Sequence, residues 1–393
     1  MDFASEKPAM SAPKSSNLND IYKKVADGKR LSRDDGLRLY ASNDLPMVGH
    51  MANITRERKN ADKAFYIINR HINYSNVCKN QCKFCAFSKE EGEEGGYSMS
   101  IDEVMREAEG VVDQGATEIH IVGGLHPKLP FDYYIDMLSR LHERYPLVHL
   151  QAFTAVEIAH LAERAGLSVR DTLRELGRAG LGSIPGGGAE VFSSRVRKEL
   201  CPDKLSGEGW LGVMRQAHEL GIRSNSTMLY GHMESAEERI DHMLELRRVQ
   251  DETGGFMTFI PLAFHSDNTA LQGLPRTTAA LDLKTLAIGR LMLDNFPHIK
   301  AFWIMLGIKL AQISLSFGVD DIDGTVLAER ITHSAGADTP EELSVAEIVR
   351  LIEEAGRRPV ERDTLYHEII RPNGRFDHDW HLAESKQAYS VKV

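Results

Sequence analysis

The chain has few cysteines and no long apolar run. Four of its 393 residues are cysteine, and three of the four lie in one short segment. A secreted domain held together by disulfides needs more cysteines, spread along the chain, so this class is excluded and a reducing compartment is expected. No run of about 18 apolar residues is present, which argues against a membrane-spanning helix. The first residues lack the apolar stretch of a signal peptide, and we therefore expect a cytoplasmic protein.

An excess of positive charge is also lacking. The formal net charge is −10 and the pI is about 5.9, which argues against nucleic acid or an anionic membrane as the main partner. Apolar residues make up 42% of the chain and charged residues 26%, as in ordinary globular proteins. The length allows one large domain or two small ones.

The most informative segment is Cys78-Lys-Asn-Gln-Cys82-Lys-Phe-Cys85, which supplies three thiolates and no fourth. Thiolates hold iron–sulfur clusters, and a cubane of four irons needs four ligands. Three protein ligands therefore leave one iron free to bind a reactant. The alternative is structural zinc, which needs a fourth ligand. His71 could complete a Cys3His set, but it belongs to a stretch expected to form a strand, and Cys201 is expected to be an ordinary buried apolar residue.

The composition divides the chain into four segments. Residues 1–16 are rich in Ser, Pro, Ala and Lys and are expected to be disordered. Residues 17–62 carry apolar residues at helical spacing and predict a helical N-terminal segment. Residues 63–366 alternate between short apolar strands and amphipathic helices, and residues 367–393 are expected to form a C-terminal tail.

The alternation within residues 63–366 predicts βα units and a parallel sheet. Capping boxes mark several helix starts, at Ser100–Glu103, Ser235–Glu238 and Ser344–Glu347. Eight strands, each followed by a helical pattern, predict an α/β fold, a (β/α)8 TIM-type barrel with an N-terminal helical extension. An open doubly wound sheet would need a G-x-G-x-x-G turn after the first strand, where this chain has its cysteines. The expected strands are residues 64–73, 117–122, 148–153, 182–184, 223–229, 257–263, 300–305 and 321–323.

Glycines and polar residues gather in the segments that follow these strands. In a barrel of this type the chemistry lies on loops at the C-terminal ends of the strands. We therefore expect these segments to meet at one end of the barrel, beside the cysteines. They are residues 123–126, 185–190, 225–232 and 261–265.

The cysteine spacing, with Phe84 before the third cysteine, resembles the signature of the radical S-adenosylmethionine (SAM) superfamily. Further blocks resemble the aminofutalosine synthase family of that superfamily, which serves the futalosine route to menaquinone. This second resemblance covers residues 17–366 and leaves the tail unmatched. Its blocks are residues 71–78, 82–87, 123–127, 151–157, 185–190, 228–232, 259–265 and 301–307.

The resemblance implies a [4Fe–4S] cluster on the three cysteines, with SAM at the open iron. Reductive cleavage of SAM would give a 5′-deoxyadenosyl radical that adds to the vinyl group of 3-[(1-carboxyvinyl)oxy]benzoate. Rearrangement across the aryl ether and loss of the carboxyl carbon would give 6-amino-6-deoxyfutalosine, with methionine and bicarbonate released. A flavodoxin- or ferredoxin-type electron donor is expected, because the sequence shows no flavin or nicotinamide motif.

Five residues are the candidates for contacts to SAM. Gly123 and Gly124 would let the backbone approach the methionine part of SAM closely, beside Phe84 of the cysteine loop. Glu190 would accept hydrogen bonds from the ribose hydroxyls. Arg197 lies seven residues later, so a helix over residues 191–199 would place it on the face of Glu190, where it could pair with the SAM carboxylate.

The implied substrate carries two carboxylates and needs cationic or hydrogen-bonding groups in an otherwise apolar barrel. His126, Asn225, His265 and Lys309 are the candidates, whereas no acid–base residue is predicted. In one departure from many superfamily members, Leu125 stands where a glutamate follows the glycine pair. The SAM contact expected there comes from the backbone, so it does not depend on that side chain.

Two alternatives remain open. A sibling radical SAM enzyme, such as the dehypoxanthine futalosine cyclase or a deazaflavin-precursor synthase, would share the cysteine loop and differ in the blocks after the strands. A non-catalytic scaffold would hold zinc with the same cysteines. Colour separates the two metals, because a protein with a cubane cluster is brown and a zinc protein is colourless.

Overall fold

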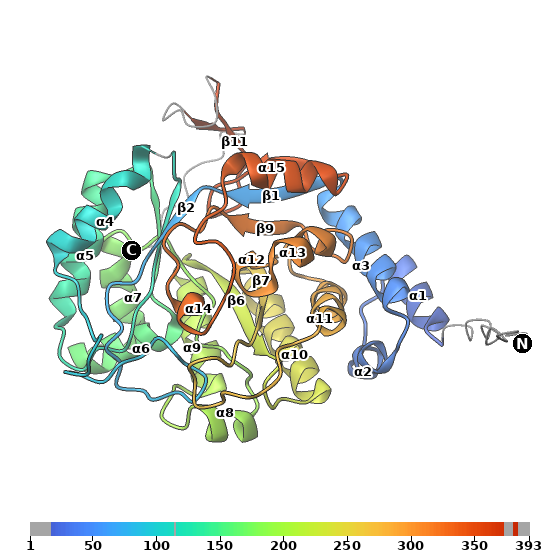
Figure 1. The fold of residues 1–393 in the computed structure, drawn as a ribbon, viewed down its shortest axis with the longest axis horizontal. Helices are drawn as coiled ribbons and strands as arrows, with labels where there is room; N and C mark the ends of the chain where they lie inside the picture. Colours follow the sequence, from blue (N-terminus) through green and yellow to red (C-terminus); the bar gives the residue numbers. More distant parts are fainter. Residues whose placement is uncertain (1–16, 114, 373–379, 384–393) are drawn as a thin grey trace, which may run out of the picture.

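The structure is a computed structural model that describes residues 17–113, 115–372 and 380–383. Its first part is helical and consists of α1 (Asn19–Ala26), α2 (Arg33–Ala41) and α3 (Leu45–Asn60). These helices lie at one side of the barrel, and α3 packs against α11 (Ala279–Met292) (Figure 1). The segment 1–16, for which disorder is expected, lies outside the described residues.

A parallel sheet of seven strands forms most of the barrel wall. Its strands are hydrogen-bonded in chain order from β2 to β8, and every neighbouring pair is parallel. This order confirms the predicted α/β class with strands and helices in alternation. The strands are β2 (Asn69–Ile72), β3 (Glu118–Ile121), β4 (His149–Ala152), β5 (Ser183–Ile184), β6 (Arg223–Tyr230), β7 (Phe256–Ala263) and β8 (His298–Ile299).

A second parallel sheet, in the order β10-β1-β9, joins the two ends of the first. Strand β1 leads directly into β2, and an isolated bridge between Lys300 and Asp321 links the end of β8 to β9. The wall thus continues from β8 through β9 and β1 back to β2. The bounds are β1 (Lys63–Ile67), β9 (Asp321–Gly324) and β10 (Arg358–Glu361).

Two predicted strands differ from the structure. The stretch 64–73 is divided at Ile68, because β1 pairs with β9 and β10 whereas β2 pairs with β3. The predicted strand 300–305 is wrong apart from Lys300, which forms an isolated bridge to Asp321: β8 ends at Ile299, and α12 (Trp303–Leu306) begins three residues after Lys300. There the indole of Trp303 donates a hydrogen bond to the backbone oxygen of Gly324 at 2.9 Å, so a tertiary contact overrides the apolar pattern of the segment.

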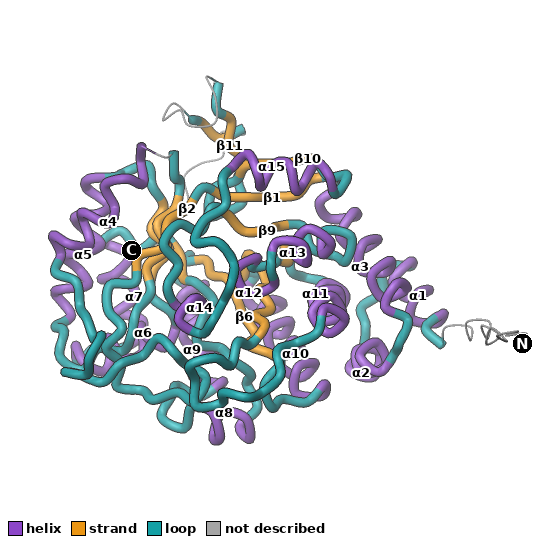
Figure 2. The backbone as a smooth tube through the Cα atoms, viewed as in Figure 1, coloured by secondary structure: helices purple, strands orange, loops and turns teal. Residues whose placement is uncertain are grey.

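The remaining helices surround the sheet, and long loops cross one end of the barrel (Figures 1 and 2). None of the described helices combines the length and the apolar character required to cross a membrane. The last two described strands, β11 (Ile369–Ile370) and β12 (His381–Leu382), form a short antiparallel pair. The remaining helices are α4 (Ile101–Asp113), α5 (Phe131–Arg144), α6 (Ala155–Ala165), α7 (Val169–Arg178), α8 (Ser194–Leu200), α9 (Gly207–Glu219), α10 (Ala236–Thr253), α13 (Ile308–Ser314), α14 (Ile331–Ser334) and α15 (Val345–Glu354).

The three predicted capping boxes are confirmed. At Ser100–Glu103 the glutamate accepts the serine N–H at 2.7 Å and the serine hydroxyl accepts the glutamate N–H at 3.3 Å. The boxes at Ser235–Glu238 and Ser344–Glu347 are formed in the same way. The structure adds a box at Thr154–Glu157, which starts α6 directly after β4 and fixes the glutamate beside the strand ends.

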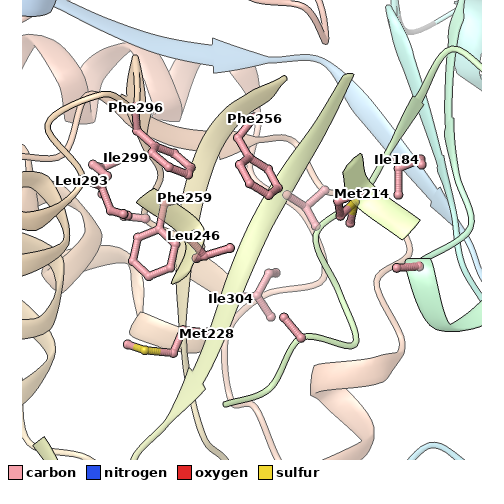
Figure 3. Close-up of a cluster of buried hydrophobic side chains, with 14 of the residues drawn as sticks. Ile184, Met214, Met228, Leu246, Phe256, Phe259, Leu293, Phe296, Ile299 and Ile304 are labelled. Carbon is pink, nitrogen blue, oxygen red and sulfur yellow. The ribbon is translucent and has the colours of Figure 1, made fainter. Parts of the chain in front are cut away.

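Aromatic residues hold the strands β6 and β7 against the outer helices (Figure 3). Phe256, Phe259 and Phe296 are fully buried, and the rings of Phe256 and Phe296 stack with centroids 5.4 Å apart. Met228 and Leu246 fill the space around them. Burial of this much apolar surface makes the wall rigid, so the loops that follow β6 and β7 start from fixed positions.

Candidate active site

A cavity of about 340 Å³ lies at the C-terminal ends of the strands. Its lining comes from residues within several strands and from the segments after β2 to β9, so the predicted strand-end segments meet in one place. The cysteine loop, the glycine pair, the Pro185–Glu190 segment, Asn225 and His265 all contribute. The apolar part of its wall includes Val122, Leu229, Ile260, Leu262, Phe264, Phe302 and Met305.

The three cysteines of the predicted motif, Cys78, Cys82 and Cys85, all line this cavity. Backbone hydrogen bonds hold their loop in place. The N–H of Cys78 donates to the backbone oxygen of Lys89 at 3.0 Å, and the N–H of Lys79 donates to that of Leu125 at 2.9 Å. Burial, together with the neighbouring Cys82 and Cys85 thiols, raises the pKa of Cys78. Bound iron would lower it, because a metal ion stabilises the thiolate.

The donor set fits a cubane with one open iron. Three thiol side chains from one loop face one cavity, and the cavity leaves room for a further ligand. In a cubane each thiolate binds a different iron, so the sulfur atoms need not converge on a point. Among the described residues, no three His, Cys, Asp or Glu side chains are close enough together to hold a single metal ion. His71, the candidate fourth zinc ligand, lies in β2 with its ring stacked on His120.

Cys201 has a neighbour that sequence reasoning missed. It is buried directly after α8, and its thiol shares a hydrogen bond with the thiol of Cys82. That bond, together with burial, raises the pKa of Cys82. Cys201 is not part of the cavity lining, which is consistent with its expected role as a buried packing residue.

The glycine pair is packed against the cysteine loop. A Cβ atom on Gly124 would lie 2.3 Å from the backbone oxygen of Val77 and 3.1 Å from the Cβ of Cys78. A Cβ atom on Gly123 would lie 2.6 Å from the ring of Tyr74. These two positions therefore require glycine for the contact between two loops, and the pair also lines the cavity.

A buried carboxylate lies beside the glycine pair. Glu157 accepts hydrogen bonds from the N–H of Gly123 at 3.0 Å and from the hydroxyl of Tyr74 at 2.8 Å. Burial raises the pKa of Glu157, although these bonds act in the opposite direction. Leu125 brings no polar side chain to this turn, and Glu157 supplies a carboxylate to it from α6. The capping box at Thr154 is the sequence signal that could have located it.

The segment after β5 brings a second carboxylate to the cavity. Gly186 lies so close to β6 that a Cβ atom would be 2.6 Å from the backbone of Ser226. Glu190 follows with a positive φ of 49° and accepts a hydrogen bond from Lys204 at 2.6 Å. The ammonium of Lys204 lies 5.2 Å from the ring centroid of Phe84, so this pair stands next to the cysteine loop. Burial alone would lower the pKa of Lys204, but the charges of Glu190 and Cys82 raise it.

Arg197 does not share a helix face with Glu190, and this part of the prediction is wrong. Helix α8 begins at Ser194, so Glu190 precedes the helix. The Arg197 guanidinium donates to the backbone oxygens of Ala189, at 2.8 Å, and of Leu205. It is buried outside the cavity lining, where it supports the segment that carries Glu190. Lys204 is the cation that the fold places beside Glu190.

Of the four residues predicted as candidates for substrate binding, two line the cavity and two lie outside its lining. Asn225 and His265 line the cavity. Asn225 donates to Gln151 at 3.3 Å, and His265 donates through Nε2 to the backbone of Met305 at 2.9 Å. The imidazole of His126 accepts two backbone N–H groups of its own turn and is not in the lining. Lys309 is exposed and lies outside the cavity.

Polar side chains on the inner faces of the strands form two layers below the glycine pair. In the first layer, Asn69 of β2 lies opposite Glu118 of β3 in the strand register. In the next layer, His120 of β3 lies between His71 of β2 and Gln151 of β4. The rings of His71 and His120 stack at 4.4 Å, and burial lowers the pKa of both. We call these residues, with Lys300 and Asp323, the cavity floor; all of them line the cavity.

Comparisons with known proteins place the chain in a family. The model described as "Radical SAM superfamily" matches residues 72–246, and the model of the "CofH/MqnC C-terminal region" matches residues 253–373. The solved structure of methylornithine synthase is similar, with a TM-score of 0.70 over 86% of this chain and 97% of that one. At 18% sequence identity this likeness shows the fold alone.

Several curated relatives are similar over most of their length. The aminodeoxyfutalosine synthase of Thermus thermophilus is 50% identical over 90% of this chain and 96% of that protein. The synthase of the same name from Streptomyces coelicolor is 44% identical, over 90% and 94%. A 5-amino-6-(D-ribitylamino)uracil–L-tyrosine 4-hydroxyphenyl transferase of Methanopyrus kandleri is 43% identical, over 77% and 84%. The chain belongs to the radical SAM superfamily and, within it, to the family that includes the aminodeoxyfutalosine synthases.

Proposed function

We propose that this protein is an enzyme that acts as an aminodeoxyfutalosine synthase in menaquinone biosynthesis. It transfers the adenosyl group of SAM to the enol ether 3-[(1-carboxyvinyl)oxy]benzoate, with loss of the carboxyl carbon, and gives 6-amino-6-deoxyfutalosine. The observation that carries the proposal is the 50% identity to the Thermus synthase over nearly the whole of both chains. The proposal is also supported by the cavity, whose lining combines three cysteines, two glycine-containing turns and a polar floor.

Each part of the cavity has a task in this reaction. Cys78, Cys82 and Cys85 would hold a [4Fe–4S] cluster, which supplies the electron that cleaves the sulfonium of SAM when it is bound. The turn at Gly123–Gly124 and the segment ending at Glu190 would bind SAM next to this loop. The apolar wall excludes water from the reacting carbon atoms, and the polar floor would hold a carboxylate of the substrate.

The proposal is tested by supplying the substrates of the two related activities in competition. Reconstituted, reduced protein is incubated without oxygen with SAM, the enol ether, L-tyrosine and 5-amino-6-(D-ribitylamino)uracil. We expect a product with the mass of 6-amino-6-deoxyfutalosine and no adduct of the tyrosine side chain. An adduct of tyrosine with the uracil would instead assign the chain to the activity of the Methanopyrus relative.

A charge-assisted hydrogen bond from SAM to Glu190 is part of this proposal. The residue lines the cavity beside Phe84 and Lys204, where ribose hydroxyls could donate to it. Glu190→Gln should keep the brown cluster and weaken SAM binding about 10- to 100-fold, the effect of losing one such bond. The spectral response of the cluster to SAM measures this. Glu208→Gln, at a side chain that is 76% exposed, is the control; equal affinities in both variants would remove Glu190 from the site.

The electron for the reaction is proposed to come from a flavodoxin or ferredoxin in the cytoplasm. A reducing compartment suits three cysteines that must remain thiolates to hold a cluster. We expect turnover with a reduced flavodoxin and none with NADPH alone, because the sequence shows no flavin- or nicotinamide-binding motif. Product formation with NADPH and no second protein would contradict this part of the proposal.

A further inference from the structure

Two lysines line the cavity, and they lie in different parts of it. Lys204 stands at the cysteine loop, beside Phe84 and paired with Glu190. Lys300 follows β8 and forms part of the cavity floor, where its ammonium donates to Asp323 at 3.1 Å. No arginine belongs to the described lining, so these two are its permanently cationic side chains.

The floor lies well below the cysteine loop. On β3, His120 precedes Gly123 by three residues and Glu118 precedes it by five. At about 3.3 Å per residue, the floor is therefore on the order of 10 Å deeper than the glycine turn that packs on the cysteines. A ligand that fills the cavity with one end near the cysteines thus places its other end at the floor.

Lys300 has hydrogen-bonding capacity left for such a ligand. An ammonium group carries three N–H donors, and within the described part of the chain Asp323 accepts one of them. The neighbouring imidazole of His71 lies in the same lining and can present a further N–H. Lys300 is itself only 7% exposed, so a bond from it to a carboxylate is poorly screened by water.

We propose that Lys300 binds the ring carboxylate of the aryl enol-ether substrate and thereby directs the vinyl group toward the cysteine loop. The proposal rests on the proposed function, because it takes the substrate from it. The apolar wall between floor and loop suits the aromatic ring, which would lie between the two charged ends of the cavity. Lys300 is then a residue that determines specificity for a benzoate over an uncharged phenyl ring.

The acidic groups around Lys300 are compatible with this role. Asp323 and Glu118 face it, with His71 and His120 next to them. Burial raises the pKa of Asp323, although the charge of Lys300 acts in the opposite direction, and the carboxylate accepts a hydrogen bond from Lys300. Asp323 therefore competes with the ligand for Lys300, and its removal should strengthen binding of the ligand.

The test compares two ligands in binding, without turnover. Reconstituted but unreduced protein is dialysed to equilibrium with SAM and either the enol ether or 2-phenoxyacrylate, the same molecule without the ring carboxylate. We expect wild-type protein to bind the enol ether about 10- to 100-fold more tightly. In Lys300→Met the affinity for the enol ether should fall to that for 2-phenoxyacrylate, whose own affinity should change little. Asp323→Asn should bind the enol ether more tightly, and the exposed Lys309→Met should match wild type.

Three results would overturn the inference: equal affinity of wild-type protein for both ligands, equal weakening of both in Lys300→Met, or weaker enol-ether binding in Asp323→Asn. Equal weakening would assign Lys300 a purely structural role. Equal affinity of wild-type protein for the two ligands would overturn the inference even if a variant fails to fold. Failure of the proposed function is a separate outcome. In that case the wild-type protein forms no adenosylated product from the enol ether.

Discussion

Alanine at Cys78, Cys82 or Cys85 is expected to abolish cluster binding and SAM cleavage in each of the three variants. All three side chains line the cavity, and with two remaining thiolates and SAM one iron of a cubane has neither a protein nor a SAM ligand. Iron and sulfide content after anaerobic reconstitution, with the absorbance of the brown protein, measures the loss. We expect about four of each per wild-type chain, the cubane stoichiometry.

Cys201→Ala is the matched control. Its thiol contacts Cys82 but lies outside the cavity lining, so iron content and SAM cleavage should stay at the wild-type level. Bleaching of this variant would show that Cys201 is a ligand and would contradict the assignment of three cysteines plus SAM. A colourless wild-type protein with one zinc per chain would instead favour the zinc scaffold.

Gly124→Ala is expected to remove most of the cluster without touching a cysteine. The new Cβ atom would lie 2.3 Å from the backbone oxygen of Val77, a distance that real Cβ atoms do not tolerate. The backbone next to Cys78 must therefore move, and we expect at least a tenfold loss of SAM cleavage together with a lower iron content. Both are measured on the reconstituted protein.

Gly212→Ala provides the comparison for this change. Gly212 lies inside α9, and no atom is within 4 Å of the position of its Cβ. Alanine favours a helix over glycine by about 1 kcal/mol, so the melting temperature should stay equal or rise, with full cluster content. If Gly124→Ala also kept a full cluster and full activity, the close contact between the glycine turn and the cysteine loop would be wrong.

The parts of the site that the sequence predicts are those governed by local pattern and strand order. Cys78, Cys82 and Cys85 are close in sequence, so their spacing alone brings them together. Gly123–Gly124 and His265 are found because every strand of a parallel barrel ends on the same side. The strand-end rule requires only that the strands are located, and the apolar alternation of the sequence locates most of the strands correctly.

The missed residues depend on packing between elements that are distant in sequence. A helix from residue 191 would bring Arg197 to the face of Glu190, but α8 starts at Ser194 and the guanidinium donates to backbone oxygens. Lys204 and Lys300 follow a helix and a strand without any motif, so no spacing rule identifies them. His126 lies at the correct end of the barrel, yet two backbone N–H groups of its own turn draw its ring out of the cavity lining.

The central claim is that SAM is consumed as a building block rather than as a source of a hydrogen-abstracting radical. Anaerobic turnover with reductant, the enol ether and SAM labelled with 13C throughout its adenosine tests this most directly. Mass spectrometry should find all of the label in 6-amino-6-deoxyfutalosine, with one methionine released per product. Free labelled 5′-deoxyadenosine, accompanied by unchanged enol ether, would contradict the account.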